Sequence, residues 1–206
     1  MANDARSLQE EIGPSATYGC KRRVWHEYNK TPHTNEADVL AAFMGKWIHK
    51  GLEHVAKSQD PFDDFLTEIA MRVGDLPGHA DFYSKGNAAV VDWKTSTKKN
   101  LKKDSFPSEN YYYQSQIYGY QLVNDKGFDV KTVWVVGVPR DGKLSDIVQS
   151  SAPYSEAEAL KGIQWIEDVK NSVEKPAPEM PRAFCEGFCP FYDPTAKVGC
   201  PSRGYR

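Results

Sequence analysis

Two short motifs near the middle of the chain hold the residue types best suited to chemistry. They read Gly78-His79-Ala80-Asp81 and, after a predicted turn, Asp92-Trp93-Lys94. Alternate side chains of a strand point to the same face, so Asp92 and Lys94 share one face. Asp81 falls on the neighbouring strand of a predicted hairpin, close enough for both carboxylates to bind one divalent ion. Oxygen ligands of this kind favour Mg²⁺ or Mn²⁺, which also bind phosphate oxygens.

Such a site predicts the hydrolysis of a phosphodiester bond. A divalent ion activates water and neutralises the charge that grows on the phosphate in the transition state. Lys94 orients or helps to deprotonate the nucleophile, or stabilises that charge. An Asp-x-Lys triplet also occurs by chance on ordinary protein surfaces, so the prediction depends on the further motifs that accompany it.

The flanking sequence predicts the elements that position these residues. A helix is expected over Asp38–Ala56, with Val39, Phe43, Trp47 (or Ile48) and Leu52 at helical spacing. A three-stranded meander follows at residues 66–73, 79–83 and 88–93, with turns at 74–78 and 84–87. This order predicts that the acidic residues lie at or near strand positions.

The second half of the chain predicts further helices and strands. We expect a helix from Ser108 through residue 123, a strand at 131–138 with a hairpin partner at 144–150, and a last helix from Ser155 to about Val173. Ser15 is expected to cap a first short helix that contains Tyr18 and Cys20. Prolines 176, 178 and 181 predict an extended tail. The predicted fold class is α/β, a mixed central β-sheet flanked by helices.

Composition limits the possible classes of protein. The chain has 206 residues, 40% hydrophobic and 26% charged, which fits one well-cored soluble domain. The longest apolar runs are far shorter than a spanning helix, and the polar N-terminus is unlike a secretory signal, so we expect a cytoplasmic protein and no membrane. The net charge of −2 argues against a protein that coats DNA. The basic run Lys98–Lys103 is either a solvated loop or a loop that contacts phosphates.

Five motifs in order resemble those of the RecB-like branch of the PD-(D/E)XK nucleases, which includes CRISPR-associated and many phage exonucleases. The motifs are Gly45-x-x-x-His49, Glu68, Gly78-x-x-Asp81, Asp92-x-Lys94 and Gln114-x-x-x-Tyr118. The resemblance covers nearly the whole chain and implies a restriction-endonuclease-like core.

The resemblance also implies a role for each of these residues. His49, Asp81, Asp92 and the backbone carbonyl of Trp93 are expected to bind Mg²⁺ or Mn²⁺, and Lys94 is the expected catalytic lysine. Glu68 either binds a metal through water or holds Lys94 by a salt bridge. Gln114 and Tyr118 are expected to shape the site and contact DNA. A second pair, Gln116 and Tyr120, overlaps them; the first pair is preferred because the family often has the form Gln-x-Gln-apolar-Tyr.

The four cysteines form a separate pattern. Cys20 lies near the N-terminus, whereas Cys185, Cys189 and Cys200 lie in the last 25 residues. Four thiolates suit an iron–sulfur cluster or a structural zinc, and spacing alone does not choose between them. Some RecB-like nucleases have one cysteine before the nuclease motifs and three after them, all binding a [4Fe-4S] cluster. The resemblance therefore favours [4Fe-4S] over zinc, with free thiols as the third alternative, although the gaps here are longer than the usual family spacing.

The sequence thus predicts a single nuclease domain over residues 1–206, with a core at about 36–175 and a cysteine cluster region formed by about 15–25 and 182–206. The expected activity is a DNA exonuclease acting on single strands or duplex ends. Its expected setting is recombination, repair, or CRISPR or phage DNA processing, alone or beside a recombination or CRISPR-adaptation protein; a phage origin would place it in the host cytoplasm. The alternatives are a non-catalytic DNA-binding or assembly module that keeps the fold and the cluster, and a redox or scaffold protein.

Overall fold

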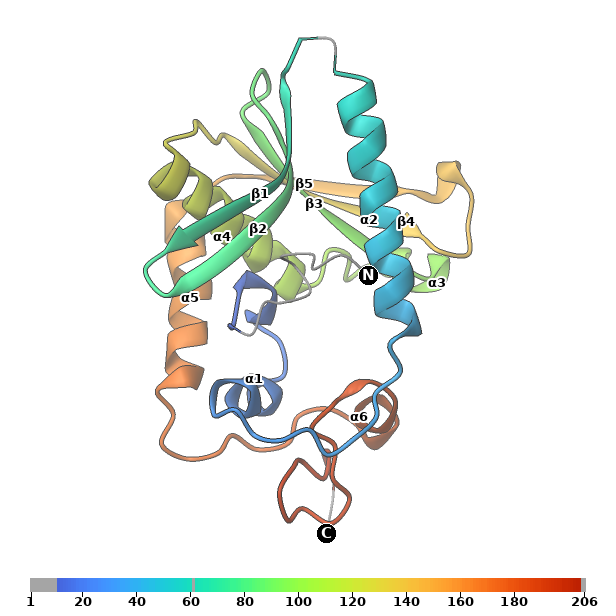
Figure 1. The fold of residues 1–206 in the computed structure, drawn as a ribbon, viewed down its shortest axis with the longest axis vertical. Helices are drawn as coiled ribbons and strands as arrows, with labels where there is room; N and C mark the ends of the chain where they lie inside the picture. Colours follow the sequence, from blue (N-terminus) through green and yellow to red (C-terminus); the bar gives the residue numbers. More distant parts are fainter. Residues whose placement is uncertain (1–10, 61, 205–206) are drawn as a thin grey trace.

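A five-stranded mixed sheet forms the centre of the molecule (Figure 1). The computed structural model describes residues 11–60 and 62–204. Neighbouring strands are antiparallel, except for the parallel pair β3–β4. In sheet order the strands are β1 (Phe65–Val73), β2 (Leu76–Ser84), β3 (Ala89–Ser96), β4 (Thr132–Pro139) and β5 (Val148–Pro153).

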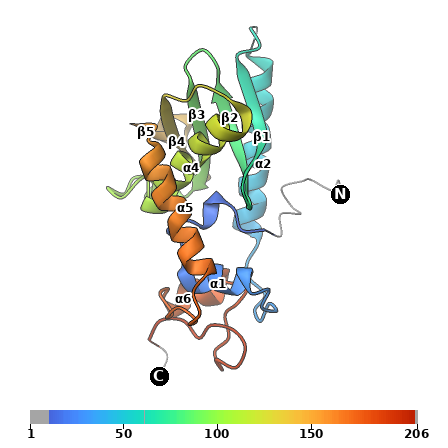
Figure 2. The same cartoon turned by 90° about the vertical axis from the view of Figure 1, so that its left-hand side faces the viewer.

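Helices cover both faces of this sheet. A parallel strand pair needs a long crossover, and α4 (Glu109–Lys126) makes it between β3 and β4. α4 and α5 (Glu156–Lys170) lie on one face, and α2 (Leu40–Ser58) lies on the other (Figure 2). The α/β class and the mixed sheet flanked by helices, both predicted from the sequence, are confirmed.

The main apolar core lies between the sheet and α4. The buried residues of this cluster come from β1, β2, β3, β4, α4 and the loop before β4: Met71, Ala80, Tyr83, Val90, Tyr118, Leu122, Val130 and Val133. α4 begins at Ser108, whose hydroxyl accepts from the backbone N–H of Tyr111, and ends at Gly127, which has φ +70°. The capped helix therefore has defined ends, which fixes which of its residues face the sheet.

The helix α1 and the segment that contains α6 lie near each other at the lower end of the molecule in Figure 1. We call α1 (Lys21–Tyr28), α6 (Arg182–Phe188) and the loop of residues 189–204 the cysteine module. Several hydrogen bonds join it to the segment before α2, among them Thr34 N to Pro190 O at 2.9 Å and Asp38 N to Gly187 O at 2.8 Å. The module therefore adjoins the N-terminal end of α2.

Three secondary-structure predictions are wrong. Tyr18 has a left-handed φ of +49° and Cys20 is the N-cap of α1, so both precede the helix that was expected to contain them. The expected extended tail contains α6, because its prolines precede Arg182 and leave the next seven residues free to be helical. The strand expected at 144–150 begins at Val148, because residues 144–146 form a 3₁₀ turn.

The prediction that Val39, Phe43 and Trp47 form a buried apolar face of α2 is also wrong. The helix itself is confirmed, but Val39, Phe43 and Trp47 are 71%, 54% and 58% exposed. They point outward because the side that carries Gly45 and His49 lies against the sheet, as the contacts of these two residues show. Within the described residues, no helix is both long and apolar enough to cross a membrane.

Candidate active site

The strands β2 and β3 separate where the two acidic motif residues lie. Their pairing ends at Phe82 opposite Val91, and the next opposed positions in the same register are Asp81 and Asp92. Asp81 Oδ2 instead accepts a hydrogen bond from the backbone N–H of Trp93 at 2.7 Å. The fully buried Asp81 side chain therefore replaces a bond of the strand ladder and is held in a fixed orientation.

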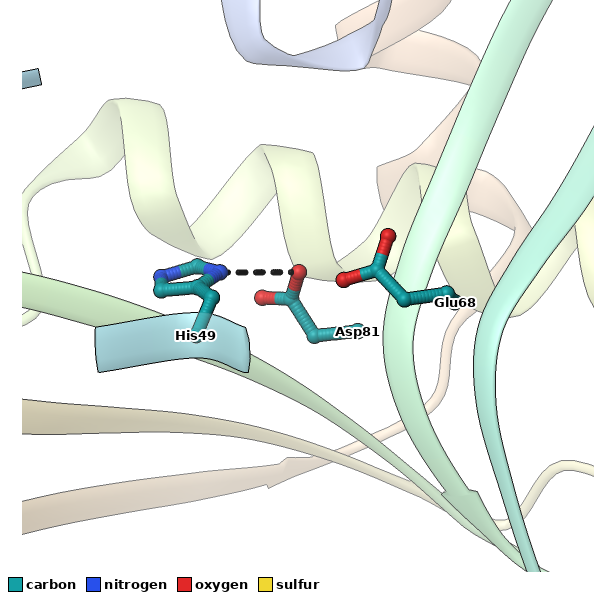
Figure 3. A group of neighbouring side chains, drawn as sticks. All are labelled: His49, Glu68 and Asp81. Atoms are coloured by element: carbon teal, nitrogen blue, oxygen red, sulfur yellow. Dashed lines mark ion pairs between the residues drawn. The ribbon is translucent and has the colours of Figure 1, made fainter. Parts of the chain in front are cut away.

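Three side chains from three elements form a candidate metal-binding group (Figure 3). His49 of α2, Glu68 of β1 and Asp81 of β2 each offer a ligand atom, and these atoms all lie within 4.8 Å of one another. His49 Nδ1 lies 3.3 Å from Asp81 Oδ1. Imidazole nitrogen and carboxylate oxygens together suit Mn²⁺, and the carboxylates suit Mg²⁺. The donor set fits the divalent ion that the sequence predicts.

Glu68 reaches this group through an unusual backbone conformation. Its neighbours Thr67 and Ile69 pair with Phe82 and Ala80, but Glu68 itself is left out of the ladder. Its φ is +49°, in the left-handed region that non-glycine residues rarely adopt. Such a conformation costs on the order of 1–3 kcal/mol and is typical of functional sites. Glu68 thus lies beside the predicted ligands His49 and Asp81.

Asp92 and Lys94 form a buried ion pair beside the metal-binding group. Lys94 Nζ lies 2.8 Å from Asp92 Oδ2, and Asp92 is 1% exposed. Burial, with a smaller contribution from the charge of Asp81, raises the pKa of Asp92 to about 6, while Lys94 opposes this shift. Asp81 and Asp92 are both buried, and their negative charges repel each other, so the site favours a further positive charge.

The lysine is fixed by residues of α4. Lys94 Nζ donates to Gln114 Oε1 at 2.7 Å, and Gln114 Nε2 donates to the Tyr118 hydroxyl at 2.8 Å. The ring of Tyr111 lies 4.9 Å from Lys94 Nζ, a contact that the sequence reasoning missed. Its signal was the spacing of three residues between Tyr111 and Gln114, which places both on one helical face.

The overlapping pair of Gln116 and Tyr120 has different surroundings. Gln116 Nε2 donates to Pro153 O at 3.0 Å, and Gln116 Oε1 accepts from Ser155 N at 2.8 Å. These bonds join α4 to the end of β5 and the start of α5. The structure therefore brings Gln114 and Tyr118 to Lys94 and uses Gln116 elsewhere.

Two motif glycines allow close packing around the site. A Cβ on Gly45 would lie 2.9 Å from Thr95 Oγ1, so the glycine lets α2 approach β3 closely enough for His49 to reach Asp81. A Cβ on Gly78 would collide with the amide of Gln121, which donates to Leu76 O. Both glycines are required by space rather than by a positive φ.

The four cysteines also come together, in the cysteine module. Cys185, Cys189 and Cys200 are 4–6% exposed, Cys20 is partly exposed, and none forms a disulfide. Burial raises the pKa of Cys185 to about 11, and the nearby thiols Cys189, Cys200 and Cys20 add to the shift. In the absence of a metal, burial therefore favours the neutral thiol form of Cys185.

The sulfur spacing bears on which metal group fits. Among the described residues, which include all four cysteines, no three sulfurs lie within 4.8 Å of one another. A single tetrahedral zinc with Zn–S bonds of about 2.3 Å would hold its sulfurs about 3.8 Å apart. The described residues therefore hold no three cysteine sulfurs arranged as closely as one zinc ion would hold them.

A cavity of about 1170 Å³ lies between the cysteine module and the start of α4. Cys20 and Arg23 line it from the side of α1, Phe184 from α6, and Asn110 and Tyr111 from the start of α4. Because the Tyr111 ring contacts Lys94, this cavity borders the candidate site. Its lining combines aromatic rings with a guanidinium group.

The comparisons with known proteins agree with this geometry at the level of the fold. No protein-family model and no curated protein matches the sequence. Among solved structures, the chain is similar to the protein SSO0001 (TM-score 0.55, 21% identity, covering 82% of this chain and 79% of that one). It is also similar to an alkaline exonuclease from Laribacter hongkongensis (TM-score 0.55, 9% identity, covering 80% of this chain and 88% of that one). A third similar structure is a phage-related exonuclease from Haemophilus somnus (TM-score 0.51, 10% identity, covering 73% of this chain and 77% of that one). The chain has the fold of these exonucleases.

Proposed function

We propose that this protein is a metal-dependent DNA exonuclease that hydrolyses phosphodiester bonds at single-stranded or duplex ends. One observation carries the proposal: the ligand atoms of His49, Glu68 and Asp81 converge within 4.8 Å beside the buried pair of Asp92 and Lys94. The fold supports it, since the similar solved structures include exonucleases. One of them, the Laribacter enzyme, has been solved in complex with dAMP (TM-score 0.51, 11% identity). A deoxynucleoside monophosphate has the chemistry of an exonuclease product.

The proposed mechanism assigns a task to each part of the site. His49, Glu68 and Asp81 hold a Mg²⁺ or Mn²⁺ ion, with Asp92 and the Trp93 carbonyl as further predicted ligands. The bound ion supplies an activated water and neutralises charge on the phosphate.

The chain's own groups position the reacting atoms. Trp93 N–H fixes the carboxylate of Asp81, and Gln114 with Asp92 fixes the ammonium group of Lys94. Lys94, 15% exposed, donates to the attacking water or to the charge that develops on the phosphate. Placing these donors before the reaction lowers the barrier because they need no reorganisation in the transition state.

An unpaired DNA end fits the surroundings of the site better than an intact duplex. The cavity beside Lys94 is lined by Tyr111 and Phe184, rings on which bases can stack. A strand that enters this cavity would bring its end to Lys94. This supports exonuclease activity on single strands or frayed duplex ends.

We also propose that the cysteine module binds a [4Fe-4S] cluster through Cys20, Cys185, Cys189 and Cys200. Three buried cysteines in the same module as Cys20 support a bound metal group, and the resemblance of the one-plus-three cysteine order to that of RecB-like nucleases favours [4Fe-4S] over zinc. Bound there, it would join the two ends of the chain next to α2. About four iron atoms and four sulfides per chain after anaerobic purification is the expected analysis, and one zinc without iron would contradict it.

The activity is tested by digestion of end-labelled single- and double-stranded DNA with Mn²⁺, using anaerobically purified protein. We expect wild type to release nucleotides from an end and Lys94→Ala to be at least about 100-fold slower. Lys131→Ala, which removes an exposed lysine at the start of β4, is the matched control and should equal wild type.

Two results would contradict the proposal. One is wild-type protein that binds Mn²⁺ but digests no DNA, which would favour the non-catalytic DNA-binding or assembly module. The other is Lys94→Ala that digests as fast as wild type, which would place the chemistry elsewhere. A protein partner from recombination, repair or CRISPR adaptation stays a prediction.

A further inference from the structure

The basic run that follows the active-site strand is an ordered part of the fold. α3 (Lys98–Leu101) begins two residues after β3 ends, and Lys98 is four residues beyond Lys94. Leu101 is 3% exposed, and a Cβ on Gly137 of β4 would lie 2.7 Å from Leu101 Cδ2. Leu101 therefore anchors α3 on the sheet at a place that a glycine leaves open.

A nearly buried carboxylate in the turn between β4 and β5 holds one side of α3. Asp146, 7% exposed, pairs through Oδ1 with Lys98 Nζ at 2.9 Å and with Lys102 Nζ at 3.2 Å. Its Oδ2 accepts from Lys143 N at 3.0 Å. In the same turn, Asp141 Oδ1 accepts from Lys98 N at 2.6 Å. Contacts with the β4–β5 turn thus hold α3 in place, so residues 98–102 do not form a solvated loop.

The same turn reaches the active-site helix. Arg140 N donates to Ser96 O at the end of β3 at 2.9 Å, and Arg140 Nη1 donates to Ala41 O of α2 at 3.3 Å. α3, the turn and the first turns of α2 therefore form one continuous rim. It lies at the edge of the sheet where β3 ends, two residues after Lys94.

This rim carries positive charge in a chain that is negative as a whole. Residues 98–104 and 140–146 contain six basic and three acidic side chains, whereas the net charge of the protein is −2. Lys98 and Lys102 turn toward Asp146, and Lys99 and Lys103, also four residues apart, are both exposed. Among residues 11–60 and 62–204, no carboxylate forms an ion pair with Lys99 or Lys103.

We propose that α3 and the β4–β5 turn form a phosphate-binding platform, on which Lys99 and Lys103 hold the DNA backbone beside the bond to be cut. The inference rests on the proposed nuclease function and adds the surface that positions its substrate. An extended segment spans about 3.3 Å per residue, so Lys98 starts at most about 13 Å from Lys94. The segment from which the Lys99 and Lys103 side chains extend is thus near enough to the site to contact phosphates a few nucleotides from the reacting one. Contacts with phosphates alone give affinity without sequence preference.

The salt dependence of binding tests the platform. Fluorescence anisotropy of a labelled oligothymidine, with intact protein in EDTA so that no cleavage occurs, gives the affinity between 50 and 200 mM salt. Each phosphate contact to a single strand contributes about 0.7 to the slope of log K against log salt. The double variant Lys99→Ala/Lys103→Ala should therefore lose about 1.4 from the wild-type slope. Lys99→Arg/Lys103→Arg keeps both charges and should restore it.

A matched control and a kinetic readout separate positioning from general damage. Lys126→Ala/Lys131→Ala removes two exposed lysines near the start of β4, at the other end of that strand, and should leave the slope unchanged. In Mn²⁺, the Lys99→Ala/Lys103→Ala variant should raise KM several-fold with kcat within about twofold of wild type, since Lys94 is untouched.

The outcomes distinguish this inference from the proposed function. If wild type digests DNA and the platform variant keeps the wild-type slope, the platform is wrong and the nuclease proposal stands. If the arginine variant behaves like the alanine variant, the loss is structural and the platform is again wrong. Wild-type protein that neither binds nor digests DNA overturns both.

Discussion

The candidate active site and the cysteine module place their reactive residues in different ways. Glu68, Asp81, Asp92 and Lys94 stand on three strands that are consecutive in the sequence and paired side by side. Cys20 and Cys200, in contrast, are separated by almost the whole chain and are set by turns and short helices. The sheet can hold its site in position without an ion, whereas the module has little apolar core of its own. Ion removal should therefore affect chemistry in the first region and folding in the second.

The largest expected effect is Asp81→Asn, which should abolish activity but leave the fold intact. The amide oxygen can still accept from Trp93 N–H, but the charge that binds the ion is lost. We expect digestion to slow by about 10³-fold, with weaker Mn²⁺ binding by calorimetry and an unchanged melting temperature. Asp129→Asn, an exposed aspartate before β4, is the control. A large fall in melting temperature for Asp81→Asn would break the comparison, since the site would then be structural as well.

Cys185→Ser should show the opposite behaviour. It removes one predicted ligand of the cluster, and binding energy of such a group is also folding energy. A loss of about 3 kcal/mol would lower the melting temperature by about 10 °C in a chain of this length. Iron content should fall while Mn²⁺ binding at the active site persists. Met180 packs against the buried residues around Cys185, so the volume-conserving change Met180→Leu is the control and should leave iron content unchanged.

The two regions should also respond to pH with opposite signs in metal-free protein. His26, fully buried in the module, has its pKa lowered to about 4 by burial and by Lys175 and Arg22. Below pH 6.5 the unfolded chain binds a proton that the folded one does not, so stability falls toward pH 4, by at most about 3 kcal/mol. The pKa of Asp92 is raised to about 6. Below pH 6 the folded chain therefore binds a proton that the unfolded chain does not, and the stability of the protein rises as the pH falls.

Chemical denaturation of metal-free protein at pH 7, 6 and 5 measures these two contributions. His26→Gln should flatten the acid loss of stability, and Asp92→Asn should remove the opposing gain. Equal pH profiles for wild type and His26→Gln would show that His26 does not carry the acid sensitivity of the module.

The smallest expected effect is Gly45→Ala. A Cβ 2.9 Å from Thr95 Oγ1 forces α2 to shift by a few tenths of an ångström, which moves His49 relative to Asp81. We expect about a tenfold lower kcat with little change in stability, because small misplacements at a reacting centre are costly. Thr95→Ala in the same chain removes the contact and should recover most of the rate. A double variant as slow as the single one would contradict this account.

Strong local signals in the sequence predicted the central sheet. The turns at Gly74-Asp75 and around Gly86 separate the three strands of the meander, and the β-branched residues of β4 are typical of a strand. Strand periodicity also placed Asp92 and Lys94 together, because it needs only neighbouring residues.

Features that depend on distant contacts were not predicted. The sequence could not show that α2 turns Phe43 and Trp47 to solvent, since Gly45 and Thr95 decide this across 50 residues. The separation of β2 from β3 and the left-handed φ of Glu68 likewise follow from tertiary structure. α6 was missed because the prolines before it indicate a break and a helix of seven residues has little periodicity of its own.

The separation of the cysteines also sets an order during synthesis. Cys20 leaves the ribosome early, and Cys200 follows 180 residues later. At roughly 5–20 residues per second, the first thiol waits about 10 to 40 seconds for the last one. The strands of the candidate site are complete well before then, so the sheet can fold while the cysteine module still lacks Cys200. Assembly of the module therefore follows that of the sheet, so the two regions are completed at different stages of synthesis.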